Sequence, residues 1–237
     1  MRQCVVKNSV GSGARWVDVA PDRFPGWVTS FARRHGVEGE DEFLIVAAAG
    51  DYVTFTAPDG AVAECHPPFP PVTNKSENAN DAAQAAEAIA AHARRPRTVG
   101  VLLVRLGGYA AGVFTGYPPA LADAKTGSRL VHGRSAAGGW SQHRFARRRE
   151  KQASEALDAA ARAAAEVFGR WGEPLDAVVL GGDKRAMAEL RQDPRLAPYL
   201  EIATDRFLTV PDPKRAVLES TPRLFTAVKI RLTEPMP

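Results

Sequence analysis

The sequence predicts an α/β protein: a mixed sheet flanked by helices, preceded by a small N-terminal α+β region. A continuous apolar run, TVGVLLVRL at 98–106, has the length of a buried central strand. Apolar residues then recur at three- and four-residue steps from Ala153 to Trp171, which indicates a long amphipathic helix. A second short apolar strand, DAVVL at 176–180, follows that helix. Strands interleaved with helices are typical of an α/β sheet.

The N-terminal third predicts one helix and several short strands. Phe24, Trp27, Val28 and Phe31 stand at helical spacing, and Gly36 ends the pattern. Apolar runs broken by AGD and PDG then indicate short strands joined by turns. We expect Trp16, Trp27 and Phe31 to belong to the core. The proline-rich stretch 66–71 predicts a linker, so the expected domains are 1–71 and 72–237.

The rest of the chain alternates helices and strands. An alanine-rich helix with late arginines precedes Pro96, and a second strand, YAAGVFTG, follows the turn at Gly107 and Gly108. The Gly-Gly-Asp turn at 181–183 predicts a tight connection with Asp183 as the N-cap of the next helix. Further expected elements are a helix around 184–190, a strand FLTV, a helix at 214–219 and a strand FTAVKIRL. From about residue 98 onward we expect one mixed sheet.

The composition limits the classes of function. The 237 residues carry a net charge of +4, which is compatible with a polyanionic partner. Cys4 and Cys65 stand far apart and form no metal-binding or disulfide pattern, so two reduced thiols of a cytosolic protein are expected. No stretch reaches the roughly 18 apolar residues of a membrane span. We therefore expect a cytoplasmic protein that binds no membrane.

Basic residues are concentrated in one segment, RLVHGRSAAGGWSQHRFARRREK at 129–151. Such a local density fits contacts with the phosphates of a nucleic-acid backbone. A solvated helix face would also account for the charge. The expected RNA-binding residues are Arg129, His132, Arg134, Arg144, Arg147, Arg148 and Lys151.

A glycine loop lies within this basic segment. Gly138 and Gly139 allow the backbone to approach another molecule closely. Trp140, Ser141 and Gln142 follow, and a helix begins there, so a neutral amide stands at a helix N-terminus. A well-placed water needs no strong base to attack a peptidyl–ribose ester, and an amide can hold that water and stabilise the oxyanion. The alternative is an ordinary turn followed by a first-turn glutamine.

The motif Gly-Gly-Trp-Ser-Gln resembles the glycine–glutamine loops of peptide-chain release factors. It is closer to the loop of Vms-like release factors, which are peptidyl-tRNA hydrolases of ribosome quality control. The strand at 98–106, the basic hairpin DAKTGSRLVHGR, the long helix and DAVVLGGDK extend the resemblance from about Thr98 to the C-terminus. The alanine- and arginine-rich composition points to the actinobacterial branch.

The resemblance implies a ribonuclease-H-like fold, as in the release-factor central domain. It implies Gln142 as the catalytic residue, a loop shaped by Gly138, Gly139 and Ser141, and no cofactor or metal. The implied partners are peptidyl-tRNA and the rRNA of the large ribosomal subunit. Two residues separate Gly139 from Gln142, whereas the release-factor loop has none. The ankyrin repeats and zinc finger of the eukaryotic Vms-like proteins are also absent.

Two other functions remain open at the level of sequence. A ribonuclease-H-like fold suggests a metal-dependent nuclease, but such chemistry needs several carboxylates around two metal ions. The central run 98–106 contains no Asp or Glu. A non-catalytic adaptor that binds tRNA or the ribosome is the other alternative. Gly181-Gly182-Asp183-Lys184 lacks the remaining positions of a nucleotide-binding P-loop.

Overall fold

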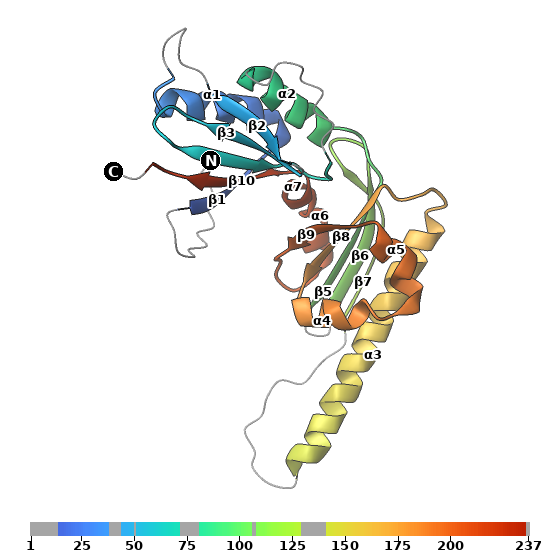
Figure 1. The fold of residues 1–237 in the computed structure, drawn as a ribbon. Coiled ribbons are helices and arrows are strands. Elements are labelled where there is room, and N and C mark those ends of the chain that lie inside the picture. Colours follow the sequence, from blue (N-terminus) through green and yellow to red (C-terminus); the bar gives the residue numbers. More distant parts are fainter. Residues whose placement is uncertain are drawn as a thin grey trace. The chain divides into compact units, whose positions relative to one another are not determined.

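The computed structural model of the chain describes residues 14–37, 44–49, 51–71, 81–105, 108–128 and 141–235. The chain divides into two compact units. One unit comprises Met1–Arg95 and Thr226–Pro237, and the other comprises Pro96–Phe225. Each contains one five-stranded sheet (Figure 1). None of the helices in the described ranges combines the length and apolarity needed to cross a membrane.

The first unit is an antiparallel sheet with two main helices. Its strands are β1 (Ala14–Val19), β2 (Ile45–Ala49), β3 (Tyr52–Thr56), β4 (Val62–His66) and β10 (Val228–Thr233). They lie in the order β1-β10-β4-β3-β2. Its helices are η1 (Pro21–Arg23), α1 (Phe24–Arg34) and α2 (Ala82–Ala93).

One face of this sheet forms the core of the first unit. Alternate residues of the strands are buried, as in β3, where Val53 and Phe55 are 3% and 0% exposed. Phe24 and Phe31 of α1 and Ile89 of α2 pack into the same apolar cluster. Both helices therefore cover the same face of the sheet, and no helix among the described residues of this unit covers the other face.

Two expectations for the aromatic residues of this region were right and one was wrong. Phe31 is fully buried, and Trp27 packs against the core and stacks on Phe31. Trp16, expected in the core, is 48% exposed. Its strand alternates, and Val17 and Val19 occupy the inward positions, so Trp16 falls on the opposite face.

Cys65 is a buried free thiol on the inward face of β4. Burial in apolar surroundings disfavours the thiolate and raises the pKa of Cys65. An inert, reduced structural thiol follows from that environment. Cys4 lies outside the described residues.

The boundary between the two units does not coincide with the domain boundary expected after residue 71. The division falls between Arg95 and Pro96, and β10 returns to the first unit. The expectation that everything after residue 98 forms one sheet is therefore wrong for β10. Its alternation of buried Val228, Ile230 and Leu232 with outward residues suits an antiparallel sheet covered on one face. It pairs with β1 on one side and with β4 on the other.

The second unit contains a mixed sheet flanked by helices, which confirms the expected fold class. Its strands are β5 (Val99–Arg105), β6 (Gly108–Thr115), β7 (Ala120–Ser128), β8 (Ala177–Gly182) and β9 (Ala203–Leu208). They lie in the order β7-β6-β5-β8-β9. β5, β6 and β7 pair antiparallel, whereas β8 runs parallel to both β5 and β9. The sheet is therefore an antiparallel meander continued by two parallel strands.

The helices of the second unit are α3 (Ser141–Arg170), α4 (Lys184–Leu190), η2 (Pro194–Leu196), α5 (Ala197–Glu201), α6 (Arg215–Glu219) and α7 (Pro222–Phe225). The central strand β5 is buried along almost its whole length, as its unbroken apolar sequence predicts. Gly100 on β5 leaves room for a neighbouring aromatic ring. A Cβ atom there would lie 3.1 Å from Cε1 of Phe168 on α3. The missing side chain therefore allows α3 to pack closely on the sheet.

The turn after β8 has the structure that the sequence predicts. Asp183 caps α4, and its Oδ1 accepts a hydrogen bond from the backbone N–H of Arg185 at 2.7 Å. Gly182 has φ +103°, a conformation that side chains disfavour. A Cβ atom at Gly182 would lie 2.1 Å from the carbonyl oxygen of Val104. The turn is a structural connection that requires glycine.

Candidate functional site

The candidate catalytic glutamine lies in the first turn of the longest helix. α3 begins at Ser141 and spans 30 residues, so Gln142 is its second residue. The first turn of a helix has backbone N–H groups without partners inside the helix, and it carries the positive end of the helix dipole. The position predicted from sequence is therefore one that favours an anion or a developing oxyanion.

Much of the predicted site lies outside the described residues. Residues 129–140 lie outside the described residues, and this range contains Arg129, His132, Arg134, Gly138 and Gly139. The helical backbone of 141–150 is described, but its side chains are not. That stretch contains Ser141, Gln142, Arg144, Arg147 and Arg148. Lys151 is described and exposed.

The described elements on either side of residues 129–140 are β7 and α3. β7, at one edge of the sheet, ends at Ser128, and α3 starts at Ser141. The segment therefore connects an edge strand to the start of a long helix.

Only the second part of α3 is built into the core. The first buried side chain among its described ones is Ala156, which is 7% exposed. Ala160, Ala164 and Val167 continue the buried stripe at three- and four-residue steps. The 15 residues from Ser141 to Glu155 precede this stripe and correspond to about 22 Å of helix. Figure 1 shows this part of α3 extending past the sheet of its own unit.

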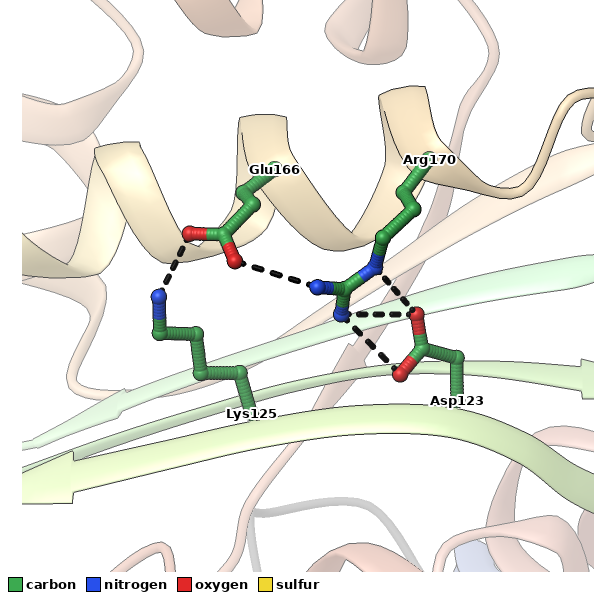
Figure 2. Close-up of polar contacts among 4 residues, drawn as sticks. All are labelled: Asp123, Lys125, Glu166 and Arg170. Atoms are coloured by element: carbon green, nitrogen blue, oxygen red, sulfur yellow. Dashed lines mark hydrogen bonds and ion pairs between the residues drawn. The ribbon is translucent and has the colours of Figure 1, made fainter.

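Polar contacts fasten the other end of α3 to β7 (Figure 2). The Arg170 guanidinium donates from Nε and Nη2 to the Asp123 carboxylate at 3.1 and 2.9 Å. Glu166 accepts from Arg170 Nη1 at 3.1 Å and from Lys125 Nζ at 2.5 Å. Asp123 and Lys125 stand two residues apart, so they share one face of β7. The four side chains form a chain of alternating charges between helix and strand.

The charges in this network change the pKa of Glu166. The hydrogen bond from Lys125, followed by the positive charges of Lys125 and Arg170, lowers the pKa of Glu166. Glu166 therefore stays ionised to a lower pH than an ordinary glutamate does. Sequence spacing identifies the helical pair Glu166–Arg170, because residues four apart face each other on a helix. The partners on β7 are more than 40 positions away along the chain and could not be identified from spacing.

A second polar contact fastens the middle of α3. Arg195, at η2, donates from Nη2 to Asp158 Oδ1 at 2.8 Å and to Asp193 Oδ2 at 2.5 Å. The hydrogen bond from Arg195 lowers the pKa of Asp193. Together with the buried stripe and the Figure 2 network, this contact fixes α3 from about Ala156 to Arg170.

A metal-dependent nuclease would need a cluster of metal-binding side chains. Within the ranges that the structure describes, no group of three or more His, Cys, Asp or Glu side chains is arranged to hold a metal ion. The buried strand β5, VGVLLVR, carries no carboxylate. A two-metal nuclease needs converging carboxylates, and the central strand supplies none.

Residues 97–231 match the family model for the actinobacteria and chloroflexi VLRF1 release factor. That range covers α3 with Gln142, the preceding glycine segment and all five strands of the second sheet. No curated protein sequence matches the chain.

Solved structures give only remote likenesses. An archaeal translation termination factor is 13% identical, with a TM-score of 0.40, over 89% of this chain and 64% of that factor. The mitochondrial localization core of Vms1 is 10% identical, with a TM-score of 0.41, over 79% of this chain and 77% of that one. Pelota from Archaeoglobus fulgidus is 10% identical, with a TM-score of 0.27, over 91% and 63%.

The matched range is more than half of the 237 residues and contains every residue of the predicted site. The chain belongs to the actinobacterial and chloroflexi VLRF1 release-factor family.

Proposed function

We propose that this protein hydrolyses the ester of peptidyl-tRNA on stalled or split large ribosomal subunits, with Gln142 positioning the attacking water. The observation that carries the proposal is the place of Gln142, in the first turn of a helix whose far end is anchored to the sheet. Membership of a release-factor family supports the reaction class. The cytoplasm, where ribosomes translate, is the proposed location.

The shape of α3 suits an active centre that is buried in another molecule. About 22 Å of helix separates Gln142 from the first buried turn of α3, so the glutamine stands far from the core of its unit. A rigid helix fixed at its far end carries a residue into a narrow space with little loss of conformational entropy on binding. The peptidyl-transferase centre of the large subunit is such a space.

The reaction needs a positioned water and a stabilised oxyanion. The water oxygen attacks the ester carbonyl carbon, and a tetrahedral intermediate forms. The bond from carbon to the ribose oxygen then breaks, and that oxygen takes the proton that the water loses. The products are a free peptide carboxylic acid, which ionises, and a tRNA with a free hydroxyl. An amide donor aimed at the developing oxyanion lowers this barrier without adding a charge that repels tRNA.

The basic residues have a separate role in this proposal. Arg129, His132, Arg134, Arg144, Arg147, Arg148 and Lys151 would contact phosphates of the tRNA or of the large-subunit rRNA. Each neutralised phosphate releases counterions, so this binding weakens as the salt concentration rises. Gly138, Gly139 and Ser141 would shape the loop that presents Gln142.

The test is a release assay with a peptidyl-tRNA bound to purified large ribosomal subunits. We expect free peptide and intact deacylated tRNA, and an unchanged rate after a chelator removes loosely bound metal ions. Cleavage of the RNA chain, abolished by the chelator, would favour a nuclease instead. Tight binding to the subunit with no released peptide would favour a non-catalytic adaptor.

A further inference from the structure

The first unit has a sheet face that its own two helices do not cover. Alternate residues of β10 point to opposite faces: Val228, Ile230 and Leu232 are buried, and Lys229 and Arg231 face outward. The helices α1 and α2 both pack on the buried side. On the outward face of β10, Arg231 is exposed and Lys229 is partly exposed.

Three ring side chains form a row across this outward face. The ring of His66 on β4 lies 5.3 Å from the ring of Trp16 on β1 and 5.0 Å from the ring of Tyr52 on β3, measured between centroids. Trp16 is 48% exposed, although an indole of this size is usually buried to a greater extent. The row thus crosses the sheet from its β1 edge and exposes aromatic surface to solvent.

Charged residues surround the row without giving it a net charge. Arg231 lies opposite Trp16 in the register of β1 and β10, and Lys229 lies opposite Asp18. Nη1 of Arg231 is 3.4 Å from Oε2 of Glu64 on β4. The two outward cations of β10 are thus matched by two carboxylates, Asp18 and Glu64. Attraction for a highly charged duplex backbone would be weak at such a face.

We propose that this face binds unpaired bases of RNA, with one base stacked on the indole of Trp16. Exposed rings on an open sheet are the chemistry that recognises single-stranded RNA, whose bases can be splayed out and stacked. Lys229 and Arg231 stand on β10, the strand between those that carry Trp16 and His66, where they would meet the flanking phosphates. A balanced charge together with exposed rings selects single strands over duplexes. The proposal concerns a different unit of the chain and does not depend on Gln142.

Binding of short oligonucleotides to the full-length protein tests the proposal. The probes are fluorescein-labelled adenosine and uridine decamers and an RNA duplex of matched length. We expect both single strands to bind, and to quench tryptophan emission, more strongly than the duplex. Trp16→Ala should weaken single-strand binding about 5- to 150-fold, the scale for losing one base–aromatic stack. Trp16→Phe keeps a ring and should restore most of the affinity.

Controls separate stacking from general damage. Ile202→Ala removes another exposed apolar side chain, 38% exposed in the second unit, and should leave binding unchanged. Because Trp16 is half exposed, Trp16→Ala should melt close to the parent temperature. Arg231→Ala should lower the log–log salt slope by about 0.7, the value for one single-strand phosphate contact. Equal affinities of the parent and Trp16→Ala proteins for the decamers would overturn the proposal.

Two sources could supply the unpaired bases in a cell, and the assay can distinguish them. Free tRNA and large ribosomal subunits are each titrated with the parent and Trp16→Ala proteins. If Trp16→Ala loses affinity only for tRNA, the stacked bases belong to tRNA. If it loses affinity only for the subunits, they belong to rRNA. If Trp16→Ala weakens subunit binding but binds every RNA probe like the parent, the face docks a protein and the proposal fails.

Discussion

Arg170 and Asp123 form a two-pronged ion pair that joins the last turn of α3 to the edge strand β7. Nε and Nη2 of Arg170 lie 3.1 and 2.9 Å from Oδ2 of Asp123, and Nη2 lies 3.2 Å from Oδ1. Planar guanidinium–carboxylate pairs of this kind fix orientation as well as distance. The pair lies 28 residues from Gln142, at the opposite end of one helix. The network of Figure 2 therefore adds to the buried stripe of α3 in orienting the helix that carries the candidate catalytic residue.

Gln142→Ala should abolish most peptide release while leaving subunit binding nearly intact. A neutral amide adds little to the attraction for polyanionic RNA, and its contribution falls mainly in the transition state. A loss of about 100- to 1000-fold in the single-turnover rate is the scale for one such group. Gln142→Glu should be equally slow, because a carboxylate cannot donate the hydrogen bond and repels the ribose-phosphate. Single-turnover release and a separate binding titration measure the two effects.

Gln152→Ala is the matched control for that prediction. It removes a glutamine from the same helix, ten positions further along, and should release peptide at the parent rate. Release by Gln142→Ala at the parent rate would remove the proposed mechanism and leave the adaptor function as the leading candidate.

Changing Arg144, Arg147 and Arg148 together to Ala should weaken ribosome or tRNA binding and flatten its salt dependence. Each lost phosphate contact lowers the log–log slope by roughly 0.7–0.9. Replacing three exposed arginines elsewhere in the unit, Arg185, Arg191 and Arg223, removes the same charge and should change the slope far less. Equal slopes for the two triple variants would show that the α3 arginines form only a solvated face.

Gly182→Ala should destabilise the second unit. The positive φ alone costs about 1–3 kcal/mol for a residue with a side chain, and the new Cβ would also meet the carbonyl oxygen of Val104. Gly169→Ala, within α3, meets only Tyr199 Oη at 3.4 Å and should be neutral or stabilise by up to about 1 kcal/mol. Urea unfolding midpoints compare the variants, and similar midpoints for both would contradict the geometry of the turn.

The Glu166 network should contribute less stability in acid. Its neighbours lower the pKa of Glu166 from its ordinary value of 4.5, so the folded state binds this proton less readily than the unfolded state. The contribution is complete above about pH 4.5 and is lost as the pH falls through the lowered value. Glu166→Gln should therefore be less stable than the parent at neutral pH, and the difference should shrink in acid.

Urea unfolding at about pH 7 and about pH 3 measures that difference. Glu173→Gln changes an exposed glutamate outside the network and should behave like the parent at both values. A Glu166→Gln deficit that is equally large in acid would mean that packing, and not charge, holds this side chain.

Local patterns in the sequence determined most of the second unit. The unbroken apolar run of β5 predicted a buried central strand, and the three- and four-residue steps after Ala153 predicted a helix packed on one side. Asp183 after two glycines predicted the cap that the structure shows. These features depend on residues close together in the chain, and the place of Gln142 at the start of α3 follows from them.

Only the tertiary structure decided what depends on residues far apart in the chain. Buried and exposed residues alternate along β10, as in any strand with one buried face. No feature of its local sequence predicts that it pairs with β1 and β4 instead of extending the second sheet. Trp16 is apolar and was expected inside, but the register of β1 gives the inward positions to its neighbours. Asp123 and Arg170 are 47 positions apart in the sequence, and only the tertiary fold brings them into contact. Periodicity fixes which face of an element is buried, whereas the partner of each element is chosen by packing over the whole chain.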